Sequence, residues 1–313
     1  VEPADTINWT PCFESTFQCA RLNLPLDYSN PSGLKAQIAL QMIPATDKAN
    51  YQGAILVNPG GPGGAGSEFV LTERDILVEL FGPTFDILGF DPRGTGATLP
   101  LAQCFNSSAQ YDAWTLQEVD TVRVGDNSIP LARARDQVLG TICGEKLGLH
   151  GVFDSATVAN DMVHILAHLG QEKLLYYGRS YGTLLGQYFA ALYPEKVDRM
   201  VLDGVADADS WARRGDFFCT TVVDGDNVMK EFFNDCSMAG PENCAVWEKT
   251  PRAVERRVER ILVNLKKEPF PIPTGPLVIT EDFVSNFIFH QLYTPMTGFP
   301  TIAAGLRAIE TRD

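Results

Sequence analysis

Residues Tyr176–Thr183 read YYGRSYGT, a Gly-x-Ser-x-Gly motif that follows an apolar segment and precedes a helical one. A strand, a tight turn and a helix in this order are the setting that a nucleophile elbow requires, so Ser180 is a candidate nucleophile. Gly178 and Gly182 are expected where strand and helix approach too closely for a Cβ atom. The motif can also occur by chance, but its setting favours the elbow.

A glycine-rich loop, NPGGPGGAG over 58–66, follows an earlier apolar strand predicted over 54–57. An acyl-transfer serine needs two backbone N–H groups directed at the oxyanion, one from the residue after the nucleophile and one from such a loop. We expect Tyr181 to be the first donor and Gly61 the second, with Gly60 as the alternative. A phosphate-binding loop is the competing interpretation, but no Gly-Lys-Ser/Thr follows and the glycine spacing does not match the dinucleotide fingerprint.

Apolar strands and helices alternate around these loops. Further strands are predicted over 20–28, 36–43, 173–178 and 199–205 and from Phe85 onward, and helices over 156–169 and 183–197. Alternation of this kind predicts an α/β fold, with a mostly parallel sheet covered by helices on both faces. Ser155 is the expected N-cap of the first helix, which Gly170 ends.

The remaining segments are less regular. A polar stretch over 101–148 is expected to hold two helices, and DPRGTG over 91–96 is interpreted as structural, with Asp91 and Arg93 pairing or capping near the sheet edge. After Asp207 we expect helices without intervening apolar strands. The predicted division is therefore a core over 1–206 and a helical lid, itself incomplete, over 207–313.

Composition restricts the partners of the chain. The formal net charge of −14 argues against nucleic acid or an anionic membrane surface as a partner. No apolar run approaches the roughly 20 residues needed to cross a bilayer. Because the chain begins at Val1 with no visible signal peptide, we expect that a leader was removed or the sequence trimmed.

The cysteines suit an oxidising compartment. Six of the cysteines form three pairs of successive cysteines along the sequence, Cys12 with Cys19, Cys104 with Cys143 and Cys236 with Cys244. The sequence has no C-x-x-C motif, so zinc or thioredoxin chemistry is not expected. Cys219 is left over, either free and buried or paired outside this chain. The sequons at Asn8 and Asn106 fit a secreted glycoprotein.

Three motifs resemble those of the tripeptidyl aminopeptidase branch of the α/β-hydrolases, which has the proline iminopeptidases as relatives. They are NPGGPGG over 58–64, DPRGTG over 91–96 and YGRSYGT over 177–183, and the segment Trp9–Tyr28 resembles the same branch. The resemblance covers about residues 9–207 and, more loosely, the lid. It implies a secreted serine exopeptidase that removes short N-terminal peptides or single residues, needs no cofactor or metal, and has a lid that admits only a free N-terminus.

The histidine of a catalytic triad is not evident. In this fold the order along the chain is serine, acid, histidine. Only His290 follows Ser180, and it lies within the predicted lid, an unfavourable place for the base. The others, His150, His164 and His168, precede the serine. His164 and His168 lie four residues apart as in a metal pair, but no third ligand pattern accompanies them.

The acid of the triad is not evident either. Asp203, Asp207 and Asp209 follow the strand that leads into the lid, whereas by resemblance the acid comes after the lid. Asp207, Asp209 and Glu281 are also candidates to bind a substrate ammonium group, although a solvated acidic surface is the preferred interpretation.

Three explanations compete for the absent base. The chain is a fragment whose missing C-terminal segment carries Asp and His, or a second polypeptide supplies them, or the protein is a catalytically dead binding homologue. The end of the sequence inside a predicted helix and the unpaired Cys219 favour a truncated chain that lacks the last strands of the sheet. We therefore expect a hydrolase that cleaves a peptide or amide bond through Ser180, with an esterase or lactone hydrolase of the same fold as the alternative.

Overall fold

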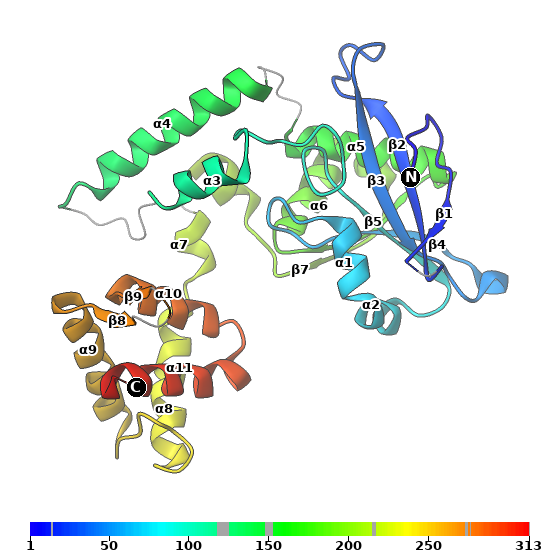
Figure 1. Ribbon diagram of the computed structural model, residues 1–313. Coiled ribbons are helices and arrows are strands. Elements are labelled where there is room, and N and C mark those ends of the chain that lie inside the picture. The colour runs from blue at the N-terminus through cyan, green and yellow to red at the C-terminus, as the bar shows by residue number, and fades with distance from the viewer. Residues whose placement is uncertain are drawn as a thin grey trace. The chain divides into compact units, whose positions relative to one another are not determined.

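A computed structural model of the chain describes residues 1–13, 15–117, 125–147, 153–214, 217–272, 275 and 277–312. The chain forms two compact units. The first comprises residues 1–118 and 130–217, and the second comprises residues 119–129 and 218–313 (Figure 1). The sequence-based division at 206/207 thus differs from this grouping, which keeps residues up to 217 with the first unit.

A seven-stranded sheet organises the described part of the first unit, in the order β1-β2-β3-β5-β4-β6-β7. Its strands are β1 (Thr10–Cys12), β2 (Phe17–Pro25), β3 (Lys35–Ile43), β4 (Gly53–Asn58), β5 (Phe85–Phe90), β6 (Leu174–Arg179) and β7 (Val197–Asp203). β4 pairs in parallel with β5 and β6, and β6 with β7, whereas β1, β2 and β3 form an antiparallel side that joins β5. The carboxyl ends of β4 to β7 therefore lie along one edge.

Helices cover both faces of this sheet, as predicted (Figure 1). Because side chains alternate along a strand, Leu56 packs toward one face and its neighbours Ile55 and Val57 toward the other. The Leu56 face packs against α5 (Ser155–Leu169) and α6 (Tyr181–Leu192), and the opposite face against α1 (Gly66–Thr72) and α2 (Arg74–Phe81).

The ends of two helices differ from the sequence-based expectation. The N-cap of α5 is Asp154, whose carboxylate accepts the Thr157 N–H, so the expectation for Ser155 was wrong by one residue. Gly170 ends this helix in the left-handed conformation, as predicted. α6 stops at Leu192 rather than continuing to 197, because Pro194 disfavours helical geometry at the preceding residue and begins the 3-10 turn η2 (Pro194–Lys196).

The remaining described elements before residue 222 are short or peripheral. They are η1 (Lys48–Asn50), α3 (Ser108–Thr115), α4 (Ser128–Leu147), η3 (Ser210–Arg214) and α7 (Phe217–Thr221). The two helices expected over 101–148 are α3 and α4. Of the helices that the structure describes, none has the length and apolar character to span a membrane.

The second unit is mainly helical, with its own apolar core. Its helices are α8 (Gly225–Ala239), α9 (Pro251–Lys267), α10 (Glu281–Gln291) and α11 (Pro295–Thr311). Phe232, Ile261 and Ile302 are among the buried residues that join them. A hairpin of β8 (Phe270–Ile272) and β9 (Leu277–Ile279) was not predicted, because strands of three residues are too short to establish a period.

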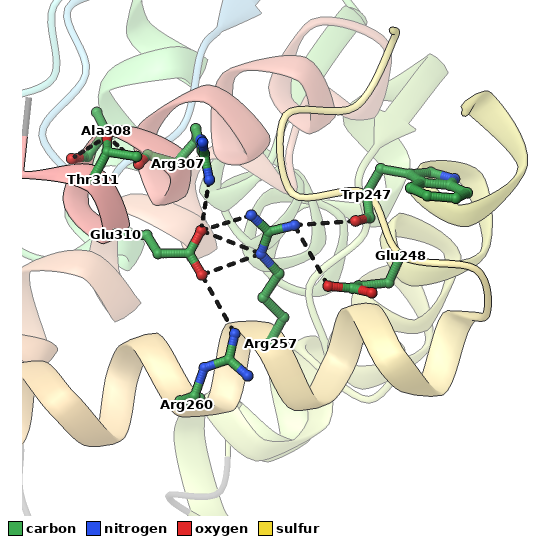
Figure 2. Close-up of polar contacts among 8 residues, drawn as sticks. All are labelled: Trp247, Glu248, Arg257, Arg260, Arg307, Ala308, Glu310 and Thr311. Carbon is green, nitrogen blue, oxygen red and sulfur yellow. Dashed lines mark hydrogen bonds and ion pairs between the residues drawn. The ribbon is translucent and has the colours of Figure 1, made fainter. Parts of the chain in front are cut away.

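An arginine–glutamate network ties α9 to α11 (Figure 2). The Arg257 guanidinium donates to both carboxylate oxygens of Glu310, the shortest contact being 2.6 Å, and to the Trp247 carbonyl. Arg260 and Arg307 also contact Glu310. Since only 13% of the Arg257 side chain is exposed, this pairing is shielded from water and contributes more than an exposed ion pair.

Candidate active site

Ser180 occupies the turn between β6 and α6. Its backbone has φ 56° and ψ −124°, a conformation that residues with a side chain rarely adopt. Such strain persists only where the surroundings enforce it, and it clusters at functional sites. The residue is exposed at the carboxyl edge of the sheet. Ser180 therefore has the backbone geometry expected of a nucleophile elbow.

Hydrogen bonds on both sides hold this strained turn. The Ser180 N–H donates to the Asp203 carbonyl at 2.9 Å. The Ser180 carbonyl accepts from the Thr183 hydroxyl at 2.6 Å and from the Thr183 N–H at 2.9 Å. Thr183 is fully buried, and its hydroxyl accepts the Ala206 N–H. The segment after β7 thus restrains the serine through Thr183, a residue that sequence reasoning did not single out.

Gly178 and Gly182 lie where strand and helix approach too closely for a Cβ atom, as predicted. A Cβ atom on Gly178 would collide with the Gly182 carbonyl, and one on Gly182 would lie 2.7 Å from the Asn58 carbonyl oxygen. A larger residue at either position would force the strand, the helix and β4 apart.

The glycine-rich loop packs directly against the elbow. A Cβ atom on Gly60 would lie 2.8 Å from the Ser180 Cβ and 3.0 Å from the Tyr181 nitrogen. The Gly60 N–H donates to the Asn58 side-chain oxygen at 3.0 Å, whereas the Gly61 and Tyr181 N–H groups have no acceptor among the described residues. Gly61 and Tyr181 are therefore available as a pair of donors, and Gly60 is not.

Tyr177 and Asp203 lie next to the elbow on neighbouring strands. The Tyr177 hydroxyl donates to the Asp203 carboxylate at 2.8 Å. Burial, together with this hydrogen bond, raises the pKa of Tyr177 to about 12, so the phenol keeps its proton near neutral pH. The side chain of Asp203 is thus engaged by Tyr177, while its carbonyl holds Ser180.

The other two aspartates beyond β7 bond locally. The Asp207 carboxylate accepts the Asp209 N–H, and Asp209 pairs with Arg213. Glu281 lies in the first turn of α10 in the second unit.

No described histidine or carboxylate side chain of the first unit hydrogen bonds to the Ser180 hydroxyl. His164 stacks on the Tyr28 ring with the ring centroids 5.1 Å apart, and His168 is exposed further along α5. His290 lies exposed on α10 of the second unit, with its ring 5.9 Å from that of Phe289. His150 lies outside the described residues.

The DPRGTG loop is structural, but Asp91 and Arg93 have separate partners. The Asp91 carboxylate accepts the backbone N–H of Ser67 in α1 and that of Ala97. Arg93 forms a buried, two-pronged pair with Asp161 of α5. Asp161 was missed, although an acidic residue among the core positions of a helix is itself a signal of a buried partner.

The three predicted cysteine pairs lie at disulfide-bonding distance, at 2.07 Å for Cys12–Cys19, 1.99 Å for Cys104–Cys143 and 1.93 Å for Cys236–Cys244. Cys219 is free and exposed, so the interpretation of a buried thiol was wrong. Both sequon asparagines, Asn8 and Asn106, are exposed.

The alpha/beta hydrolase fold family matches residues 53–313. The chain belongs to this family. Among its relatives, serine protease Hip1 of Mycobacterium tuberculosis is 38% identical over 216 residues, which are 65% of this chain and 40% of that protein. Tripeptidyl aminopeptidase of Streptomyces lividans is 33% identical over 300 residues, covering 92% of this chain and 54% of that protein.

Carboxylesterase B of Mycobacterium tuberculosis is 36% identical over a shorter stretch of 121 residues, covering 34% of this chain and 22% of that protein. This alpha/beta hydrolase thus resembles both peptidase-named and esterase-named proteins. It spans about half the length of the curated peptidase-named relatives.

Proposed function

We propose that this alpha/beta hydrolase cleaves peptide or amide bonds through an acyl-Ser180 intermediate, as an exopeptidase that releases short N-terminal peptides or single residues. The observation that carries the proposal is the positive φ of Ser180 on a strand-to-helix turn against which the glycine loop packs. The similarity to peptidase-named proteins over most of the chain supports a peptide substrate.

The proposed reaction follows the chemistry of acyl transfer. The Ser180 hydroxyl oxygen attacks the substrate carbonyl carbon while a general base takes its proton, and the carbonyl π electrons move to oxygen. The Tyr181 and Gly61 N–H groups stabilise that oxyanion, with the N-terminal dipole of α6 adding to the effect. When the C–N bond breaks, the leaving amine receives the proton, and water then hydrolyses the acyl-enzyme in the same manner.

The base and its orienting acid are proposed to come from residues that this chain does not contain. The supporting observation is that the Ser180 hydroxyl has no histidine or carboxylate partner in the described first unit. His290 is the less favoured candidate, because it lies on a helix of the second unit rather than after a strand of the sheet.

An oxidising, extracellular location is part of the proposal. Three cysteine pairs at bonding distance and two exposed sequon asparagines support it. The net charge of −14 supports a small peptide or ester partner rather than nucleic acid or an anionic membrane.

A carboxylic-ester hydrolase is the second candidate, favoured by the similarity to the esterase-named relative. Matched substrates separate the two, using protein expressed from its complete reading frame. We expect Ala-Ala-Pro p-nitroanilide with a free N-terminus to be hydrolysed, its N-acetylated form to be inert, and Ser180→Ala to abolish turnover. Turnover of p-nitrophenyl esters alone would establish the esterase, and equal turnover of the free and acetylated peptides would contradict an exopeptidase.

A further inference from the structure

We infer that Asn58 is a positioning residue, which sets the glycine loop so that the Gly61 N–H, and not the Gly60 N–H, is presented to the oxyanion. This inference rests on the proposed function of Ser180. Asn58 is the last residue of β4 and the first residue of the NPGGPGG motif, and it is only 1% exposed.

The side chain of Asn58 restrains the loop at its first glycine. Its oxygen accepts the Gly60 N–H at 3.0 Å, and the Gly60 carbonyl in turn accepts the Gly64 N–H at 3.1 Å. Gly60 and Gly61 have φ of 101° and 114°, in a region that glycine enters and leaves at little cost. A loop with this freedom keeps one conformation only if bonds from outside hold it, and the Asn58 side chain supplies one.

The same residue also contacts the elbow. Asn58 pairs with Gly178 in the register of β4 and β6, and a Cβ atom on Gly182 would lie 2.7 Å from its carbonyl oxygen and 2.9 Å from its side-chain oxygen. One buried residue thus touches the glycine loop and the start of α6. Since the two proposed oxyanion donors belong to these segments, Asn58 sets their spacing.

The hydrogen bond from the Gly60 N–H to Asn58 also determines which of two neighbouring N–H groups, that of Gly60 or that of Gly61, can bind the oxyanion. With its N–H given to Asn58, Gly60 cannot donate to a substrate, whereas Gly61 has no acceptor among the described residues. An oxyanion hole works because its donors are fixed before the charge develops, so a free and mobile Gly60 N–H would weaken it. The competing role for Asn58 is general stability, as for any buried amide that is hydrogen bonded.

Amide exchange of the ¹⁵N-glycine-labelled chain tests the geometry. We expect a slow Gly60 N–H and a fast Gly61 N–H. Asn58→Leu, which keeps the shape but loses the acceptor, should accelerate exchange at Gly60 by about tenfold, and Asn58→Asp, which keeps the acceptor, by less than about threefold. Val57→Ala, a packing loss at a fully buried neighbour, is the control and should leave Gly60 protected. Slow exchange at Gly60 in Asn58→Leu, or an equal effect in Val57→Ala, would overturn the inference.

The rate of Ser180 labelling by a fluorophosphonate tests the catalytic consequence, in protein expressed from its complete reading frame. Asn58→Leu should slow labelling by about 10²-fold, the effect of losing one oxyanion donor, whereas Val57→Ala should change it only a few-fold. Labelling of Asn58→Leu at the wild-type rate would overturn the positioning role. If the fluorophosphonate does not label the wild type although the Gly60 amide exchanges as expected, the proposed function and the catalytic role of Asn58 are contradicted. The claim that Asn58 restrains the glycine loop is then still supported.

Discussion

The Ser180 N–H donates to the carbonyl oxygen of Asp203 across 2.9 Å, which joins the proposed nucleophile to the end of the neighbouring strand β7. The Asp203 carboxylate is held in turn by the Tyr177 hydroxyl. The strained backbone of Ser180 is therefore maintained by residues on two strands and not by its own turn alone.

Thr183→Val should destabilise the first unit by about 1–3 kcal/mol. Valine keeps the shape, but the buried Ala206 N–H loses its acceptor and the Ser180 carbonyl loses a donor. Urea unfolding measures the change. Thr301→Val is the control, because that exposed hydroxyl bonds only to its own helix at Thr297, and it should change stability by less than about 0.5 kcal/mol. Equal effects would contradict the role of Thr183.

Breaking the Arg93–Asp161 pair should be among the costliest changes in the first unit. The two side chains are 0% and 1% exposed, and Arg93 also donates to the Leu26 carbonyl. Burial alone would lower the pKa of Arg93, but the hydrogen bonds and charge of Asp161 raise it above its usual value, so the arginine stays charged. Arg93→Met or Asp161→Asn should each lower the unfolding free energy by about 3–5 kcal/mol, because a buried charge loses its partner.

A double-mutant cycle completes that test. Arg93→Met combined with Asp161→Asn should cost less than the sum of these two single changes, since neither charge is then left alone. The exposed pair of Arg74 with Asp75 is the matched control, and Asp75→Asn should cost less than about 1 kcal/mol. Additive effects at Arg93 and Asp161 would contradict a coupled pair.

His164 should make the protein less stable as the pH falls below about 6.5. Burial lowers the pKa of His164, an effect to which His168 adds and which Asp161 partly opposes. The unfolded chain therefore binds the proton more readily than the folded one, so stability falls as pH drops below the unfolded value of about 6.5. His164→Phe, which keeps a ring on Tyr28, should flatten this dependence in urea midpoints. His168→Phe removes only the smaller contribution and should leave most of the dependence in place.

Protonation of Glu310 should separately destabilise the second unit at acidic pH. Hydrogen bonds from Arg257, opposed in part by burial, lower the pKa of Glu310. Stability from this group is present above the unfolded pKa of about 4.3 and is lost as the pH falls through the lower folded value. Arg257→Met should cost about 1.5–3 kcal/mol at pH 7 and little at low pH. Arg213→Met, at a more exposed pair, should cost much less, and equal losses would contradict the network in Figure 2.

Local patterns predicted the fold well. The apolar strands, the helix that Gly170 ends and the turn at Ser180 are all specified by neighbouring residues, and the structure contains each of them. Two helix boundaries differ from the prediction, because more than one local rule applies at those positions. Asp154 rather than Ser155 caps α5, and Pro194 ends α6 earlier than predicted.

The supporting residues of the site were not predictable in this way. Thr183 and Asp203 act through bonds to segments that the chain brings together only on folding. Asn58 bonds to Gly60 only two residues away, but its contact with Gly182 of α6 likewise forms only on folding. The partner of Arg93 is likewise 68 residues away in Asp161. A motif identifies the residue with the chemistry, whereas the contacts that hold it depend on tertiary structure.

The identity of the nucleophile is tested most directly by the site of covalent labelling. Protein expressed from its complete reading frame is treated with a fluorophosphonate, and the modified peptide is identified by mass spectrometry alongside Ser180→Ala. We predict one phosphonylated residue, Ser180, and no labelling of the variant. Labelling that persists in Ser180→Ala, or a folded wild type that does not label, would contradict Ser180 as the nucleophile.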